Sequence, residues 1–175
     1  AGTYRSVYPV KVNQLHEVVT EILDAGQAFN IGLECGSKAE LLATLPLVGD
    51  KTLLLCNGVK DDVMLSLMLN AQQLGQQVVP IIEKYSEFEQ LMALAKARSL
   101  RPRMGVRLKL GTRGSGHWSE SGGARSKFGL TLPELVMLVQ QLERDEMSEQ
   151  LELLHFHLGS QISDIQVLRS AVKEI

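Results

Sequence analysis

Short apolar runs alternate with longer amphipathic segments along this chain, and the alternation repeats six times. The apolar runs have the length of strands and occupy residues 7–12, 31–34, 52–56, 77–82, 103–110 and 151–157. The segments that follow them carry apolar residues at helical spacing and occupy residues 14–25, 37–47, 61–74, 85–98, 132–145 and 163–175. Such alternation is typical of parallel strands joined by right-handed helical crossovers. The sequence therefore predicts an α/β protein built on a parallel sheet.

Two architectures share this pattern, a doubly wound open sheet and a TIM-type parallel (β/α)8 barrel. A barrel needs eight strands and roughly 250 residues, whereas about six β-α units are predicted in 175 residues. The pattern fits both architectures, and a barrel would require further sequence. Two helix starts are marked: Ser37 with Glu40 is a capping box, and Ser86 is an expected N-cap.

The charge balance bears on the class of partner. The chain has 18 Lys and Arg against 20 Asp and Glu, a formal net charge of -2. A protein that binds nucleic acid or an acidic membrane surface usually carries a basic surplus, so neither partner is expected. No run approaches the roughly 20 apolar residues of a membrane-spanning helix, and no basic-then-apolar leader opens the sequence.

The two cysteines, Cys35 and Cys56, each end an apolar run. We expect them to be buried free thiols rather than a disulfide, which fits a cytoplasmic protein and leaves a periplasmic location open. His155 and His157 lie two residues apart, but no residues near them complete a metal site. No metal ligands are therefore assigned.

Polar residues gather directly after the predicted strands. They include Lys11 and Asn13, residues 34–38, residues 57–61, Glu83 and Lys84, and His157 with residues 159–161. In parallel α/β folds the functional site lies at the carboxyl ends of the strands. This edge of the sheet is therefore the expected site.

Lys11 ends the first apolar run, with a valine on each side. We expect its amine to be partly desolvated, which disfavours the ammonium form. A neutral lysine amine can form a Schiff base. The alternative is a lysine that reaches from the strand end into water.

His157 and Ser160 follow the last predicted strand, separated by Leu158 and Gly159. Period-two alternation places His155 and His157 on one face of that strand. Gly159 lets the backbone approach a ligand, and Ser160 offers a hydroxyl and an N–H at a helix start, a combination that suits a phosphate. The alternative is a core histidine and an ordinary N-cap serine.

Residues 111–123 hold five of the chain's 15 glycines. They match neither the P-loop nor the dinucleotide-binding fingerprint. The segment is either a flexible loop or a lid over a site, in which case Trp118, the sole tryptophan, would report on the ligand.

Five stretches of the sequence occur in the order of one known family. They are residues 8–14 (YPVKVNQ), 32–41 (GLECGSKAEL), 56–61 (CNGVKD), 126–130 (SKFGL) and 153–161 (LLHFHLGSQ). Together they resemble the pyridoxal-phosphate-dependent basic amino acid decarboxylases of the alanine-racemase-like barrel fold. Residues 114–118 (GSGHW) and 121–123 (SGG) resemble the arginine branch rather than the ornithine or diaminopimelate branches.

The resemblance implies a role for each matching residue. Lys11 matches the lysine that holds pyridoxal 5'-phosphate as a Schiff base, and Glu34 matches the acidic residue near that lysine. His157 matches the histidine that stacks on the pyridine ring, and Ser160 matches a phosphate-binding serine. Lys11, His157 and Glu34 are thus the expected catalytic residues. Three more residues fall in stretches that approach the site without an assigned role: Asn57, Arg125 and Lys127.

The resemblance also implies an activity, the decarboxylation of L-arginine to agmatine and CO2 in polyamine biosynthesis, by a homo-oligomer. Magnesium is a further cofactor possible in the family, with no site visible here. The family's Glu-Pro-Gly-Arg segment, which supplies the partner of the pyridine nitrogen, does not occur in residues 1–175. We therefore expect residues 1–175 to be one barrel domain, truncated at both ends and without the C-terminal β domain, and to be inactive alone. The alternatives are a sister decarboxylase for ornithine, lysine or diaminopimelate, and a non-catalytic protein that binds the cofactor.

Overall fold

The computed structural model describes residues 4–110, 127–159 and 164–174. The chain divides into two compact units, Ala1–Ile81 with Ser86–Met104, and Ile82–Tyr85 with Gly105–Ile175. The strands follow one another in chain order in a six-stranded sheet, β1-β2-β3-β4-β5-β6. This order and the parallel pairing of the first four strands confirm the predicted α/β class. Among the described residues, no helix is both long and apolar enough to span a bilayer.

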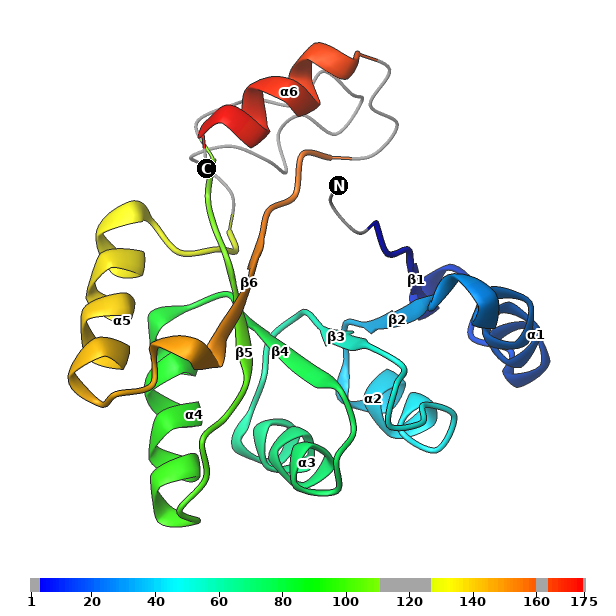
Figure 1. Cartoon of the computed structure of the whole chain (residues 1–175), viewed down its shortest axis with the longest axis horizontal. Coiled ribbons are helices and arrows are strands. Elements are labelled where there is room, and N and C mark those ends of the chain that lie inside the picture. The colour runs from blue at the N-terminus through cyan, green and yellow to red at the C-terminus, as the bar shows by residue number, and fades with distance from the viewer. Residues whose placement is uncertain (1–3, 111–126, 160–163, 175) are drawn as a thin grey trace. The chain divides into compact units, whose positions relative to one another are not determined.

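The first unit repeats the strand–helix alternation. Its elements are β1 (Val7–Pro9), the 3-10 turn η1 (Val10–Val12), α1 (His16–Gly26), the 3-10 turn η2 (Gln27–Phe29), β2 (Gly32–Cys35), α2 (Lys38–Thr44), β3 (Leu54–Cys56), α3 (Asp62–Gln73), β4 (Val78–Ile82) and α4 (Tyr85–Ala97). The last residue of β4 and the first of α4 belong to the second unit. The helices α1, α2 and α3 are arranged along one side of β1, β2 and β3 (Figure 1).

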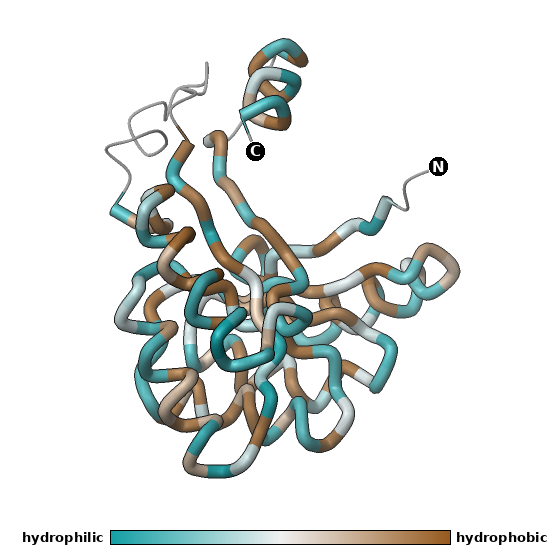
Figure 2. The backbone as a smooth tube through the Cα atoms, turned by 60° about the vertical axis from the view of Figure 1, so that its left-hand side comes forward, coloured by the Kyte–Doolittle hydropathy of each residue, from teal (hydrophilic) through white to brown (hydrophobic). Residues whose placement is uncertain are grey.

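Register explains which strand residues meet these helices. Tyr8, Leu33, Leu54 and Val78 form one row across the four strands. They pack against apolar side chains of the helices, which include Val19, Leu41, Met64 and Met68. Figure 2 shows hydrophobic and hydrophilic residues mixed along the helices, the pattern expected when only one face of each helix is buried. The alternate row, which includes Glu34, projects from the opposite face of the sheet.

The first strand is shorter than predicted. It ends at Pro9, and Val10–Val12 form a 3-10 turn in place of the last residues of the expected strand 7–12. Pro9 has no N–H for a ladder hydrogen bond, and the turn instead buries Val10 to 2% exposure. Ser86 is also not an N-cap, because α4 begins at Tyr85.

The second unit contains β5 (Met104–Arg107, whose first residue belongs to the first unit), α5 (Leu132–Arg144), the 3-10 turn η4 (Ser148–Gln150), β6 (Leu151–His155) and α6 (Ile165–Glu174). Leu108 pairs in parallel with Leu130, and its N–H donates to the His155 carbonyl at 2.8 Å. A capping box that the sequence analysis missed, Thr131 with Glu134, starts α5. The strands predicted at 103–110 and 151–157 end at Arg107 and His155.

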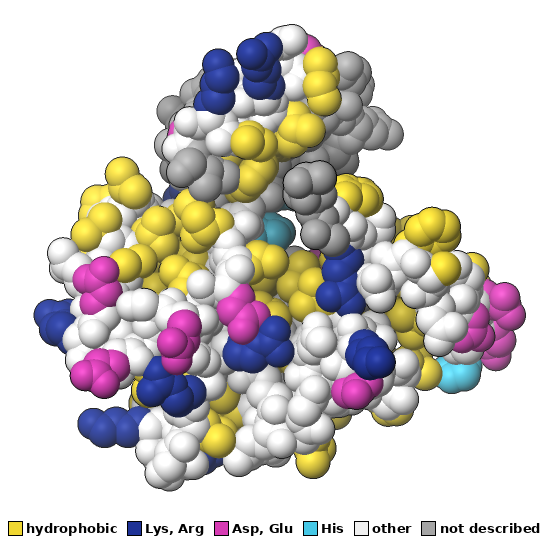
Figure 3. Space-filling view, in the orientation of Figure 1, with side chains coloured by type: hydrophobic (Ala, Val, Ile, Leu, Met, Phe, Trp, Pro, Cys, Tyr) yellow, Lys and Arg dark blue, Asp and Glu magenta, His cyan; other side chains and the backbone are white. Residues whose placement is uncertain are grey.

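Charged side chains of both signs lie interspersed on the face that Figure 3 shows. This agrees with the nearly balanced count of 18 basic and 20 acidic residues. A basic surface for a polyanion would instead show one sign gathered over neighbouring elements.

Candidate active site

Lys11 lies in η1, directly beyond the carboxyl end of β1. Its side chain is exposed, and Val12 beside it is 69% exposed. The expectation that flanking valines desolvate Lys11 is therefore wrong, because the 3-10 turn carries residues 11 and 12 away from the core. Among the described residues, the Lys11 amine makes no hydrogen bond or ion pair. The strand–turn geometry thus presents a primary amine without a partner at the predicted edge.

Glu34 lies in β2, in register with Pro9 of β1. It is half-buried between the fully buried Leu33 and Cys35, so its carboxylate projects from the face opposite the helices. No hydrogen bond or ion pair within the described part of the chain occupies that carboxylate. Since η1 lies beside β2, the structure brings Lys11 and Glu34 to the same edge of the first unit.

A hydrogen-bonded link holds the two turns at this edge together. The Gln14 amide donates to one Glu40 oxygen at 3.1 Å, and the other Glu40 oxygen accepts from the Gly36 N–H at 2.7 Å. The predicted cap is confirmed in part: the Ser37 hydroxyl accepts from the Glu40 N–H at 3.2 Å. Glu40 reaches Gly36 rather than the Ser37 N–H, so it also ties the start of α2 to the segment after η1.

The end of β3 adds Asn57 to the same edge. Its N–H donates to the Cys35 carbonyl at 2.9 Å, which continues the β2–β3 ladder by one residue. Its side-chain oxygen Oδ1 is buried and has no hydrogen-bond partner among the described residues. Gly58 then turns with φ +77°, and a Cβ there would lie 2.2 Å from the Gly36 oxygen. Only glycine fits this close approach of two turns.

Two ion pairs that the sequence analysis missed lie at the β3–α3 turn. Lys60 is fully buried and donates to Gly58 O at 2.6 Å and to Glu87 at 3.4 Å. An exposed pair joins Lys38 to Asp61, the N-cap of α3. The Lys38 ammonium and the Met64 N–H hold the pKa of Asp61 below its usual range. In the sequence Lys60 is followed by Asp61, and this pattern alone does not indicate which of the two side chains is buried.

The two thiols are buried and free, as expected. Cys35 and Cys56 occupy paired positions of β2 and β3, with 3.4 Å between their sulfur atoms. Burial raises the pKa of the Cys56 thiol well above its usual range, and the neighbouring Cys35 raises it further. Neither thiol is therefore suited to act as a nucleophile.

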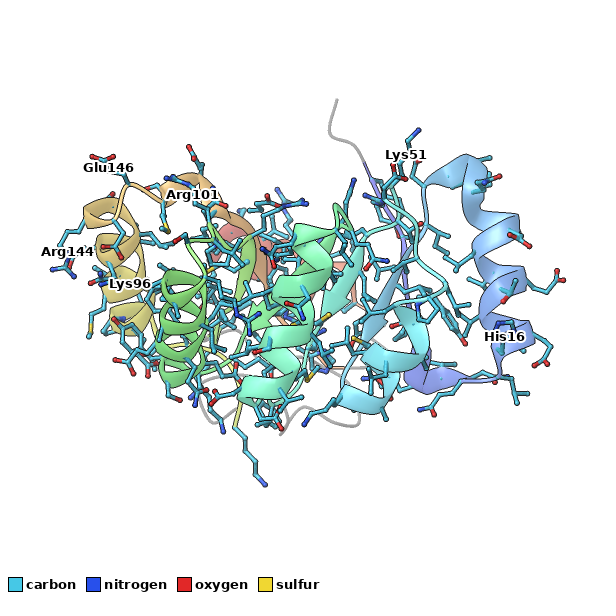
Figure 4. All side chains as sticks on the ribbon, turned by 90° about the horizontal axis from the view of Figure 1, so that it is seen from below. His16, Lys51, Lys96, Arg101, Arg144 and Glu146 are labelled. Atoms are coloured by element: carbon cyan, nitrogen blue, oxygen red, sulfur yellow. The ribbon has the colours of Figure 1, made fainter. Side chains whose placement is uncertain are left out.

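Figure 4 shows the two ends of the first unit. His16 begins α1 shortly after Lys11 and lies at the end that carries the site. Lys51 precedes β3 and lies at the opposite end. A cavity of about 370 Å³ occurs at that amino end, lined in part by Arg5, Asp24 and Lys51. It is separate from the residues that the sequence selected.

The second unit has its own buried ion pair after the strands. Arg107 at the end of β5 donates to Glu83 at 2.8 Å, and the Glu83 side chain is 2% exposed. The Arg107 guanidinium also lies over the Phe128 ring, 5.8 Å from its centre. Sequence analysis named Glu83 only as a polar residue after a strand and missed Arg107.

The remaining predicted residues belong to the second unit or lie outside the described part of the chain. His157 lies two residues beyond the end of β6 and is exposed, so it does not share a strand face with His155. Gly159, with φ +102°, turns the chain directly before Ser160. Ser160, Arg125 and the loop 111–123 with Trp118 lie outside the described residues. Lys127 is described and exposed.

The polar groups at the edge of the first unit fit pyridoxal phosphate better than a metal ion. An amine that is unpaired within the described part of the chain, a carboxylate and a buried amide oxygen are groups that an aldehyde-bearing, hydrogen-bonding aromatic cofactor can use. Within the described residues, no three His, Cys, Asp or Glu side chains are grouped as metal ligands would be.

All of residues 1–175 match the family model described as pyridoxal-dependent decarboxylase, pyridoxal binding domain. The chain belongs to the pyridoxal-dependent decarboxylases. It is 47% identical over 171 residues to the biosynthetic arginine decarboxylase of Rhodopirellula baltica, a match that covers 98% of this chain and 26% of the relative. The biosynthetic arginine decarboxylase of Deinococcus radiodurans is 46% identical over 175 residues, covering 99% of this chain and 26% of that protein. This decarboxylase chain thus spans about a quarter of the length of the curated relatives it matches.

Solved structures agree with the family. The biosynthetic arginine decarboxylase of Campylobacter jejuni superposes with a TM-score of 0.86 at 35% identity, covering 99% of this chain and 28% of that one. A diaminopimelate decarboxylase from Helicobacter pylori, solved with L-lysine, gives a TM-score of 0.73 at 21% identity, covering 95% of this chain and 41% of that one, which bears on the fold alone. Of the two architectures that fitted the pattern, the barrel of these decarboxylases is confirmed.

Proposed function

We propose that the protein containing this chain decarboxylates L-arginine to agmatine and CO2, with pyridoxal 5'-phosphate attached to Lys11. One observation carries the proposal: an exposed amine that makes no hydrogen bond or ion pair with the described residues lies at the carboxyl edge of the sheet, in a chain that matches a pyridoxal-binding domain throughout. The names of the relatives from R. baltica and D. radiodurans support arginine as the substrate.

The cofactor, when bound, supplies an electron sink for the bond to the departing carboxylate. The residues of this chain are proposed to hold and orient the cofactor and the substrate. Lys11 would provide the nitrogen that attaches the cofactor covalently, and its amine would be the group at this edge that carries a proton. Glu34, whose carboxylate makes no hydrogen bond within the described residues, is proposed to be the acidic residue near that lysine, as the family resemblance implies.

The resemblance of residues 153–161 supports two further assignments in the second unit. His157 would pack on the cofactor ring, and Ser160 would bind its phosphate. These two assignments depend on the sequence resemblance alone.

The whole protein is proposed to be a cytoplasmic homo-oligomer whose partners are small molecules. The free, buried thiols Cys35 and Cys56 support a reducing compartment. The domain that these residues form is proposed to be the pyridoxal-binding barrel, with residues 1–175 as one part of it. No magnesium ligands are proposed.

The test uses the full-length enzyme and four amino acids: arginine, ornithine, lysine and diaminopimelate. We expect CO2 and agmatine from arginine, little product from the other three, and none from Lys11→Ala. Product mainly from another amino acid would replace arginine as the substrate. A cofactor-binding protein without turnover on any of the four would contradict decarboxylation. Lys38→Ala, at the same edge, is the matched control and should retain turnover.

A further inference from the structure

The Lys60–Glu87 contact differs from the neighbouring Lys38–Asp61 pair because both of its side chains are buried. The Lys60 side chain is 0% exposed and that of Glu87 4%, whereas Lys38 and Asp61 in the neighbouring pair are 38% and 58% exposed. Removing two charges from water costs free energy that their attraction often fails to return. A well-packed apolar pair would stabilise the fold as well, so a role beyond stability is indicated.

The contacts show which part of the backbone this pair fixes. Glu87 holds residue 60 twice, since one oxygen accepts from the Lys60 N–H at 3.2 Å and the other from its ammonium at 3.4 Å. The same ammonium donates to Gly58 O at 2.6 Å. Glu87, in the first turn of α4, therefore holds Lys60 directly and Gly58 through the Lys60 ammonium.

The start of the same turn, at Asn57 and Gly58, is held by contacts with the end of β2. The Asn57 N–H donates to Cys35 O at 2.9 Å, and Gly58 lies against Gly36 O with no room for a side chain. Held from both sides, the turn keeps Asn57 Oδ1 buried without a hydrogen-bond partner among the described residues. A buried acceptor left unpaired is costly unless a ligand completes it.

We propose that Lys60 and Glu87 are positioning residues, which fix the β3–α3 turn so that Asn57 Oδ1 accepts a hydrogen bond from an N–H or O–H group of the ligand held at Lys11. The inference deepens the proposed function and rests on it for the ligand. The fixing of the turn itself does not depend on any ligand.

The test compares full-length Lys60→Met/Glu87→Met with the control Lys38→Met/Asp61→Asn, which removes the exposed pair and keeps a capping side chain. In the cofactor-free proteins, amide hydrogen exchange at Asn57 should be about tenfold faster in the buried-pair variant and unchanged in the control. Cofactor affinity should fall about tenfold in the same variant, with the melting temperature close to wild type.

A third variant separates positioning from general weakening. If the pair acts through Asn57, adding Asn57→Ala to the double variant should cost no further cofactor affinity, although Asn57→Ala alone lowers it. Additive losses overturn the proposal, as do unchanged exchange and affinity in the double variant. Should the double variant fail to fold, Glu87→Gln, which keeps an oxygen for the Lys60 N–H, is read in the same way. Absence of cofactor from Lys11 in the wild type would instead refute the proposed function, and the exchange measurement would still decide whether the pair fixes the turn.

Discussion

The sulfur atoms of Cys35 and Cys56 lie 3.4 Å apart at paired positions of β2 and β3, and both side chains are fully buried. This contact lies on the helix-facing side of the sheet, whereas Glu34 between Leu33 and Cys35 projects from the other side. The alternation along β2 thus separates a packed interior from the edge that carries the candidate site.

The buried thiols should resist alkylation in the folded protein. Burial excludes the reagent and raises the pKa of Cys56, so little thiolate forms at neutral pH. Iodoacetamide followed by mass spectrometry should find both cysteines unmodified in native protein and modified after denaturation. Rapid native labelling of either residue would contradict the packing described.

Gly58→Ala should destabilise the protein by about 1–3 kcal/mol through its positive φ alone, and further through contact with Gly36 O. Gly75→Ala is a matched control, because Gly75 also has positive φ (+86°) but a Cβ there would meet nothing within 4 Å. Urea unfolding should show the larger loss for Gly58→Ala. Equal losses would mean that the Gly58–Gly36 approach is relaxed without cost.

Asp61 should contribute to acid sensitivity. Its pKa in the folded protein is lowered by Lys38 and by the Met64 N–H, so its stabilising effect is present above the unfolded pKa of about 3.9. That effect is lost as the pH falls through the lower folded pKa. Melting temperatures from pH 7 to pH 3 should fall less steeply for Asp61→Asn than for wild type. A fall in melting temperature as steep as that of the wild type in Asp61→Asn would refute the assignment.

Glu134 should stabilise the N-terminus of α5. Its carboxylate accepts from the Thr131 N–H at 2.7 Å and from the Thr131 hydroxyl at 2.8 Å, contacts that lower its pKa. Glu134→Ala should cost about 1 kcal/mol, and Glu134→Gln should recover part of this because an amide oxygen can still accept. Chemical denaturation measures both changes. A neutral Glu134→Ala would contradict the capping box.

The order of elements was predictable because apolar periodicity reports burial directly. Runs such as residues 52–56 and 77–82 became β3 and β4 since each is buried on both faces. Ends were less predictable: Pro9 closed β1 early, and the strand expected to reach His157 ended at His155. The end of a strand depends on where its neighbouring strand ceases to provide hydrogen-bond partners, and the local sequence does not show this position.

The position of the candidate site residues along the sheet edge was predictable from the sequence, but their burial and contacts were not. The rule that parallel strands present their carboxyl ends located Lys11, Glu34 and Asn57 before any coordinates. Burial of Lys60 was not predictable, because its partner Glu87 is 27 residues away and on another element. The exposure of Lys11 reversed the expectation drawn from its valine neighbours, since a turn rather than a strand holds it.

The most direct test of the central claim is borohydride reduction of the full-length holoenzyme followed by peptide mapping. Reduction fixes the carbon–nitrogen linkage between an attached pyridoxal group and its lysine. We predict that the modified residue is Lys11, with Lys38 and Lys60 at the same edge unmodified. A pyridoxyl group on any other lysine, or none in an enzyme that retains its cofactor, would contradict the assignment.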